Sequence, residues 1–200
     1  RLATDYIDLH QCHRADPETP LEETVRAYED LIRQGKLLYW GVSEWSHQQI
    51  EAAVEVADRG RAYRPISNQP QYSMLRRGIE KRVLRTCTKR GIGQIVWSPL
   101  AQGVLTGKYG TGARPEGTRA AHPVQSRFME AFLTEEMLAR VERLRPIAAD
   151  LGLTMSQLAV AWVLRQPDVA SAIVGATSPS QLEETAKASG VVLPPEALAK

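Results

Sequence analysis

The chain has 200 residues, with 25 Lys and Arg against 23 Asp and Glu, so its formal net charge is +2. This balance excludes the strong basic excess typical of nucleic-acid-binding domains, and it does not favour a highly charged disordered chain. Hydrophobic residues make up 43% of the chain, enough for a core, and the longest apolar runs are far too short for a membrane insertion.

Five short apolar segments alternate with helical patterns along the chain. They are Tyr6–Cys12, Leu37–Val42, Ile66–Gln69, Gln94–Trp97 and Ala170–Val174. The first four begin about 30 residues apart, which is the length of one βα unit. Their length and composition predict buried parallel strands. The longer interval before the fifth holds the Gly-rich stretch 107–117 and an additional helix.

Four helices are predicted from capping signals, in which a hydroxyl residue is followed three positions later by Glu or Gln. The signals are Thr19-Pro20-Leu21-Glu22, Ser46–Gln49, Thr154–Gln157 and Ser178–Gln181. Pro20 is expected at the first helical position, while Gly35 and Gly60 are expected to end the first two helices. Apolar periodicity predicts two more helices, at Arg77–Arg90 and Thr134–Leu151.

Successive βα units are typical of an open doubly wound sheet or of a (β/α)₈ barrel. No glycine fingerprint of the dinucleotide-binding type opens any of these helices, which disfavours the first. A complete barrel has eight strands in about 250 residues. We therefore expect an α/β fold that is a partial TIM barrel, comprising the C-terminal five βα units and missing the N-terminal strands.

The ends of the chain favour the same interpretation. It begins at Arg1 rather than Met, and Pro194–Lys200 resembles the start of a helix. We expect a single domain, residues 1–200, truncated at the N-terminus and short at the C-terminus. The two cysteines, Cys12 and Cys87, are too few for a disulfide framework and lack metal-ligand spacing. They predict a cytoplasmic protein without a metal site.

Polar or aromatic residues follow every predicted strand, where the functional residues of βα proteins gather. These residues are His13, Ser43, Gln69, Trp97 and the run Gly175-Ala176-Thr177. Pro99 predicts an extended conformation for Ser98, which would hold the ring of Trp97 in one direction.

The strand-end segments resemble the aldo-keto reductases, in order and over nearly the whole chain. The resemblance rests on Asp5–Leu9 continuing to Asp16, Tyr39–Trp45, Asn68–Tyr72, Trp97–Tyr109, and Gly175–Thr177 with Gln181–Glu184, which match the family's fourth to eighth strands. The sequence motifs at Trp97–Ala101 and Leu105–Tyr109 most resemble the branch that includes the potassium-channel β-subunits. The resemblance implies hydride transfer from NADPH to a small-molecule aldehyde or ketone.

The resemblance also implies roles for individual residues. His13 is the one member of the family's catalytic group in this chain, since the Asp, Tyr and Lys would lie on the missing strands. The 200 residues alone are therefore expected to lack reductase activity. Ser43 and Gln69 would hold the nicotinamide carboxamide, and Trp97 would stack on the nicotinamide ring.

The remaining implied cofactor contacts lie later in the chain. The pyrophosphate region would be met by Ser98, Pro99, Leu100, Ala101, Gln102 and Lys108, and the adenosine phosphates by Arg119. The 2′-phosphate would be approached by Gly175, Ala176 and Thr177. On the last helix, Gln181 would meet phosphate and Glu184 would meet adenine. Lys108 and Arg119 taken singly are equally typical of solvated surface charges. NADP rather than NAD follows from the resemblance, because the residues near Thr177 are small and neutral. Glu44 and Thr185 stand where many members carry Asn, so neither is assigned a role.

Two other functions compete with a carbonyl reductase. The first is a non-catalytic NADP-binding regulatory β-subunit of a potassium channel. His13 favours the enzyme, because such subunits can carry Asn at that position. The second is a metal-dependent barrel hydrolase, which would require His or carboxylate clusters at several strand ends. The resemblance is also compatible with a homo-oligomer.

Overall fold

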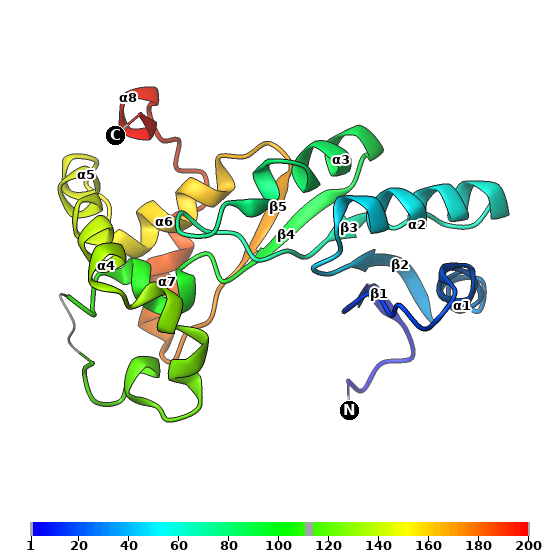
Figure 1. The fold of residues 1–200 in the computed structure, drawn as a ribbon, viewed down its shortest axis with the longest axis horizontal. Helices are drawn as coiled ribbons and strands as arrows, with labels where there is room; N and C mark the ends of the chain where they lie inside the picture. Colours follow the sequence, from blue (N-terminus) through cyan, green and yellow to red (C-terminus); the bar gives the residue numbers. More distant parts are fainter. Residues whose placement is uncertain (1, 111–113, 200) are drawn as a thin grey trace. The chain divides into compact units, whose positions relative to one another are not determined.

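The computed structural model describes residues 2–110 and 114–199, which form helices and strands in alternation (Figure 1). The strands are β1 (Ile7–Cys12), β2 (Leu37–Val42), β3 (Ser67–Asn68), β4 (Gly93–Trp97) and β5 (Val169–Ile173). The α-helices are α1 (Leu21–Arg33), α2 (His47–Gly60), α3 (Val83–Arg90), α4 (Glu135–Glu142), α5 (Leu144–Asp150), α6 (Met155–Leu164), α7 (Pro179–Ala186) and α8 (Pro195–Leu198). Short 3₁₀ segments are η1 (Gly78–Glu80), η2 (Ala101–Thr106), η3 (Arg119–Ala121), η4 (Gln125–Phe128) and η5 (Glu130–Phe132).

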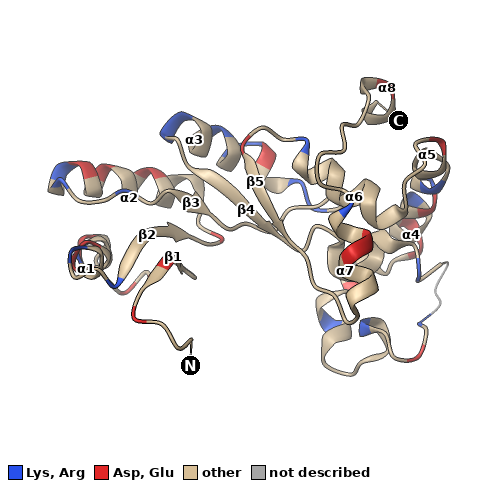
Figure 2. Ribbon diagram, turned by 180° about the vertical axis from the view of Figure 1, so that it is seen from behind, with Lys and Arg blue, Asp and Glu red and all other residues tan. Residues whose placement is uncertain are grey.

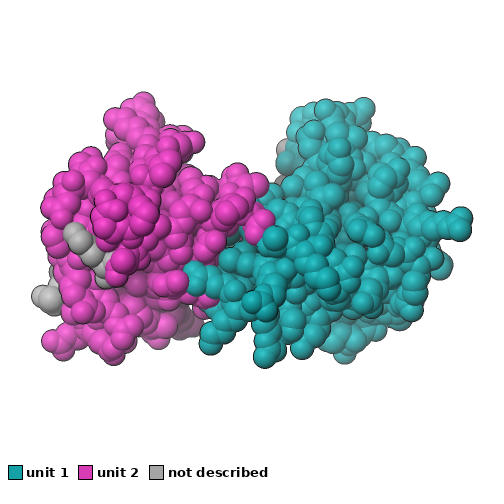
Figure 3. Space-filling model, turned by 90° about the horizontal axis from the view of Figure 1, so that it is seen from above, with its two compact units in different colours: residues 1–70, 78–96 teal, residues 71–77, 97–200 magenta. Residues whose placement is uncertain are grey.

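The chain divides into two compact units (Figure 3). Unit 1 comprises residues 1–70 and 78–96, and unit 2 comprises residues 71–77 and 97–200. Unit 1 holds strands β1 to β4, which pair in parallel and in chain order. The predicted α/β class with parallel strands is therefore confirmed, and the bounds of the five strands agree with the sequence prediction to within one residue at each end. Strand β3 is shorter by one residue at both ends, so it includes only two of the four predicted residues.

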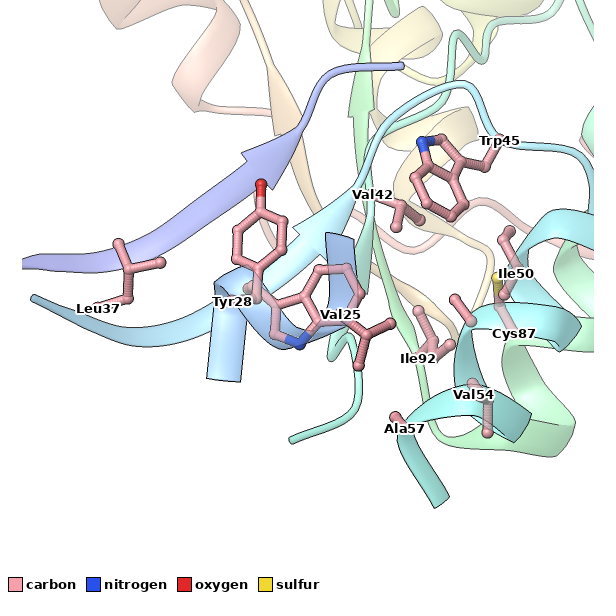
Figure 4. Packing of buried hydrophobic residues seen from close by; sticks show 12 residues of the cluster. Val25, Tyr28, Leu37, Val42, Trp45, Ile50, Val54, Ala57, Cys87 and Ile92 are labelled. Carbon is pink, nitrogen blue, oxygen red and sulfur yellow. The ribbon is translucent and has the colours of Figure 1, made fainter. Parts of the chain in front are cut away.

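The core of unit 1 lies between β2 and the helices α1 and α2 (Figure 4). The ring of Tyr28 stacks on the fully buried Trp40 with centroids 4.5 Å apart, and the Trp40 indole N–H donates to the carbonyl of Tyr63 at 2.8 Å. Leu38 and Tyr39 of the same strand remain 45% and 54% exposed. The expectation of wholly buried strands is thus wrong for β2. Leu38 and Tyr39 are successive residues and point to opposite faces, so neither face of the sheet is fully covered at this part of the strand.

Of the four predicted capping signals, two form complete capping boxes, the one at Ser178 caps α7 without the reciprocal bond, and the one at Thr19 is wrong. Ser46 and Thr154 each accept from the backbone N–H three residues on, and the Gln there reciprocates. Thr19 makes no such bond, and Pro20 is the N-cap of α1 rather than its first residue. The Thr19 hydroxyl instead donates to Asp16 at 2.8 Å, in a local turn that competes with the cap.

Three helix boundaries also differ from the sequence prediction. Gly60 is the last residue of α2, and the left-handed conformation that ends this helix falls on Arg61, with φ of 52°. The predicted helix Thr134–Leu151 is two helices, joined at Arg143. Pro146 lies in the first turn of α5 and has no backbone N–H, so it cannot donate the hydrogen bond that would continue α4 into α5. The predicted helix Arg77–Arg90 begins only at Val83, after the 3₁₀ segment η1.

Helix α6 forms the centre of unit 2, and Figure 2 shows it without charged residues. Eight of its ten residues are buried. The Gln157 amide donates to the Glu184 carbonyl at 3.0 Å and so fastens α7 to α6. Within the described residues no single helix is long and apolar enough to cross a membrane; the segments 135–150 and 155–164 meet that test only together, bent by 90°.

Gly41 allows three strands of unit 1 to share one polar contact. Its register partners are Gln11 on β1 and Ser67 on β3, and the Gln11 amide reaches across it to donate to Ser67 Oγ at 2.8 Å. A Cβ at Gly41 would overlap both side chains and lie 2.7 Å from the Ser67 carbonyl oxygen.

We predict that Gly41→Ala lowers the free energy of unfolding by about 1–3 kcal/mol, the usual effect of overpacking. Urea denaturation followed by circular dichroism measures it. Gly60→Ala is the matched control, because a Cβ there meets nothing within 4 Å and helical Ala is favoured over Gly. Equal stability of the two variants would contradict the close packing across Gly41.

Candidate cofactor-binding site

Unit 1 brings three predicted site residues to one edge of its sheet. His13 directly follows β1, Ser43 directly follows β2, and Gln69 directly follows β3. The buried Ser43 hydroxyl donates to the Gln69 carbonyl at 2.9 Å. Parallel pairing explains the arrangement, because it places the carboxyl ends of neighbouring strands together.

Arg14, to which the sequence alone assigns no role, connects two members of this group. Its guanidinium donates to the His13 carbonyl at 2.6 Å and to Ser43 Oγ at 3.5 Å. The His13 residue itself is exposed, so its imidazole is accessible to a ligand. Glu44, next to Ser43, holds a positive φ of 58°, a conformation that non-glycine residues adopt at a cost of about 1–3 kcal/mol. The position of Arg14, a charged residue just after the end of β1, is the feature of the sequence that could have indicated its role in this group.

Unit 2 contains the loop that follows β4, and its backbone is unusual. Ser98, Ala101 and Gln102 all have positive φ, at 58°, 47° and 59°. The expected extended conformation of Ser98 is therefore wrong. Pro99 disfavours the right-handed helical region for Ser98 but leaves the left-handed region open. Ser98 is held there because its carbonyl accepts from the Ala101 N–H at 2.9 Å and its Oγ from the Gln102 N–H at 3.2 Å.

A chain of side-chain contacts joins four of the predicted cofactor residues in unit 2. Gln102 Nε2 donates to Ser98 Oγ at 3.0 Å, and Gln102 Oε1 accepts from Arg119 Nη1 at 2.5 Å. Arg119 in turn lies against Gly175, where a Cβ would stand 3.7 Å from its Nη2. The structure thus gathers segments that are more than 70 residues apart in the chain.

Lys108 adds a second cation to this group. Partial burial lowers the pKa of its ammonium group, and the nearby Arg119 charge lowers this pKa further. Lys108 lies over the ring of Tyr109 at 5.3 Å, and neither Lys108 nor Arg119 pairs with a carboxylate in the described part of the chain. Two uncompensated cations side by side favour the binding of an anion.

The hydroxyl of Tyr109 is a further unused polar group beside Lys108. It is buried and makes no hydrogen bond within residues 2–110 and 114–199, although Thr118 and the Ala120 backbone lie near enough to influence its pKa. Burial is the larger influence and raises that pKa, so the phenol stays a proton donor. A buried donor without an acceptor is unfavourable unless a ligand supplies one.

The start of α7 carries the remaining predicted residues. Gly175, Ala176, Thr177 and Gln181 are exposed, and Gln181 Oε1 accepts from the Thr177 N–H at 2.9 Å. Ser178 caps the helix through the Gln181 N–H. Glu184 has a second role that the sequence did not reveal, because its carboxylate accepts from the Thr154 hydroxyl at 2.7 Å and links α7 to α6.

The other predicted residues lie along the same loop. Pro99 and Ala101 are buried, while Trp97 and Leu100 are half-buried, and the Trp97 carbonyl accepts from the Tyr72 N–H at 3.3 Å. Stacking of Trp97 on a nicotinamide stays a prediction. The two cations, the Tyr109 hydroxyl and the glycine at 175 together fit a phosphate-bearing cofactor. In the described residues no group of three or more His, Cys, Asp or Glu is placed to hold a metal ion.

The family model described as "Aldo/keto reductase family" matches residues 1–200. The chain belongs to the aldo/keto reductase family. It is 47% identical over 193 residues to a "Probable voltage-gated potassium channel subunit beta" of Arabidopsis thaliana, covering 96% of this chain and 59% of that protein. It is 44% identical over 203 residues to the protein of the same description from Oryza sativa subsp. japonica, covering 100% and 62%.

A third relative extends the match to fungi. A "Putative voltage-gated potassium channel subunit beta" of Schizosaccharomyces pombe is 42% identical over 205 residues, covering 100% of this chain and 59% of that protein. The resemblance to the branch that includes the channel β-subunits is thereby confirmed. The chain spans about three-fifths of the length of these curated relatives.

We predict that Arg119→Gln raises the pKa of Lys108, because it removes the neighbouring positive charge that lowers it. The measurement is an NMR titration of the Lys108 side chain in protein labelled at lysine. Arg59→Gln, on α2 of unit 1, removes one charge elsewhere and serves as the control. An unchanged Lys108 titration in Arg119→Gln would show that the two cations are not electrostatically coupled.

Proposed function

We propose that this aldo/keto reductase family chain binds NADP(H) and forms part of an oxidoreductase that reduces a small aldehyde or ketone. The observation that carries the proposal is the pair of uncompensated cations, Lys108 and Arg119, held beside Gly175 and the strained loop at Ser98. A diphosphate placed there would neutralise both charges and accept from the Tyr109 hydroxyl.

The residues of this chain would act mainly by binding and orientation. Lys108 and Arg119 would hold the phosphates, and the exposed residues before α7 would approach the adenosine end through their backbone. When bound, the cofactor supplies a hydride to the carbonyl carbon. His13, accessible at the end of β1, would donate a hydrogen bond to the carbonyl oxygen and so orient the substrate.

We predict that Lys108→Met weakens NADPH binding by about tenfold to a hundredfold, the usual effect of losing a charge-assisted hydrogen bond. Isothermal titration calorimetry measures it, and a weaker dependence of affinity on salt should accompany the loss. Lys89→Met, at the exposed end of α3, is the matched control for the loss of one lysine. NADPH affinity that is the same in both variants would contradict the proposed phosphate site.

A regulatory β-subunit is the second candidate function, because the relatives at 42–47% identity are described as probable or putative voltage-gated potassium channel β-subunits. The two candidates share the cofactor site and differ in turnover. An enzyme consumes NADPH with a carbonyl substrate, whereas a regulatory subunit binds NADPH and forms a complex with a channel without such turnover.

We predict that the complete protein consumes NADPH with an aromatic aldehyde, and that His13→Asn lowers this turnover by about 10²–10⁴-fold, the typical contribution of acid–base and hydrogen-bonding groups. NADPH affinity, measured in parallel, should stay the same. His47→Asn, in the first turn of α2, is the control for a histidine outside the site. Equal turnover in His13→Asn and the parent protein would remove His13 from the mechanism.

No turnover in the parent, together with retained NADPH binding and co-purification with the cytoplasmic domain of a potassium channel, would favour the regulatory subunit.

A further inference from the structure

Unit 2 contains a cavity apart from the residues assigned to the cofactor. It has a volume of about 700 Å³, within the range typical of small-molecule sites. Its wall is made by the segment after β3 and by α4 and α5, with Met74, Leu144 and Ile147 among its apolar side chains. All the lining residues belong to unit 2, so the cavity is a property of this unit alone.

A smaller recess of about 200 Å³ adjoins this cavity. The two share Met74, Arg77, Leu144 and Ile147, and the recess is also lined by Leu158 and Trp162 on α6 and by apolar side chains of α8 and the segment before it. Leu158 and Trp162 are only 3% and 8% exposed, so the recess ends on the core of unit 2. Apart from Arg77 its lining is apolar, and an alkyl chain would find hydrocarbon on most sides.

Three arginines, Arg77, Arg140 and Arg143, line the wider part of the cavity, and none of its lining residues is Asp or Glu. Arg77 is held over the Trp162 ring at 5.1 Å, at the boundary between the wide part and the recess. Arg140 pairs with Glu136 at 2.5 Å, but both side chains are more than half exposed, so this pair competes only weakly with a ligand.

We propose that this cavity binds a medium-chain carboxylate, with the alkyl chain in the recess and the carboxylate at the arginines. The recess admits a single chain, whereas an amphipathic peptide helix would require a groove for a row of side chains. Planar guanidinium groups pair with carboxylates through two parallel hydrogen bonds. Neither an uncharged chain nor a short carboxylate would use both parts of the cavity.

Calorimetric titration of the complete protein with octanoate, octanol and acetate tests the proposal. We expect octanoate to bind and the other two to bind at least tenfold more weakly. Affinity along a series of longer carboxylates should rise about fourfold for each added methylene until the recess is full. Octanol binding as tightly as octanoate, or no octanoate binding, would overturn the proposal.

Variants separate this site from the phosphate-binding cations. We expect the double variant Arg140→Gln with Arg143→Gln to weaken octanoate binding about tenfold, and Arg59→Gln, in unit 1, to leave it unchanged. Ile147→Gln, which makes the shared wall polar, should abolish the gain from longer chains, provided its circular dichroism matches the parent.

Lys108→Met should leave octanoate affinity unchanged, because the proposed site is independent of NADPH. Loss of octanoate binding in this variant would show that the carboxylate binds at the cofactor cations, which would overturn the proposal.

Discussion

Parallel pairing of β1, β2 and β3 is the constraint on which the rest of unit 1 depends. Because all three strands run the same way, the residue that follows each strand lies at the same edge. His13, Ser43 and Gln69 therefore become neighbours although long helices separate them in the chain. The buried stack of Tyr28 on Trp40 holds α1 against β2 and stabilises this arrangement.

Close approach between strands gives the pairing its precision. Gln11 and Ser67 meet across Gly41, so the register of three strands is tied to one position without a side chain. A shift of one residue would move every side chain of a strand to the other face. The hydrogen bond of Ser43 to the Gln69 carbonyl extends the same register one step beyond the ladder, into the candidate site.

Several unfavourable interactions of unit 2 lie in and near the loop that follows β4. Three non-glycine residues of the loop after β4 have positive φ, two cations lie together, and one buried hydroxyl lacks an acceptor. Each feature opposes folding, and an anion at the proposed phosphate site would neutralise the two cations and supply the missing acceptor. Helix α6 is well buried, is capped by Thr154 at its start and is joined there to Glu184 of α7, so it provides a stable support for these features. The recess beside the arginine-lined cavity lies against the same helix.

The sequence alone was sufficient for the features that depend on neighbours a few residues away. Strand spacing, the caps at Ser46 and Thr154, and the motifs from Trp97 to Tyr109 are all local, and they led to the α/β class and the family. Thr19 failed as a cap because Asp16, also local, offers its hydroxyl a better partner. The left-handed Ser98 is also held by local contacts, to Ala101 and Gln102, although the restriction by Pro99 alone does not reveal them. Only the tertiary structure decided the approach of Arg119 to Gly175, the contact of Arg14 with Ser43 and the link from Glu184 to Thr154. Each of these depends on groups brought together by packing, and their position relative to one another is not encoded in any short segment.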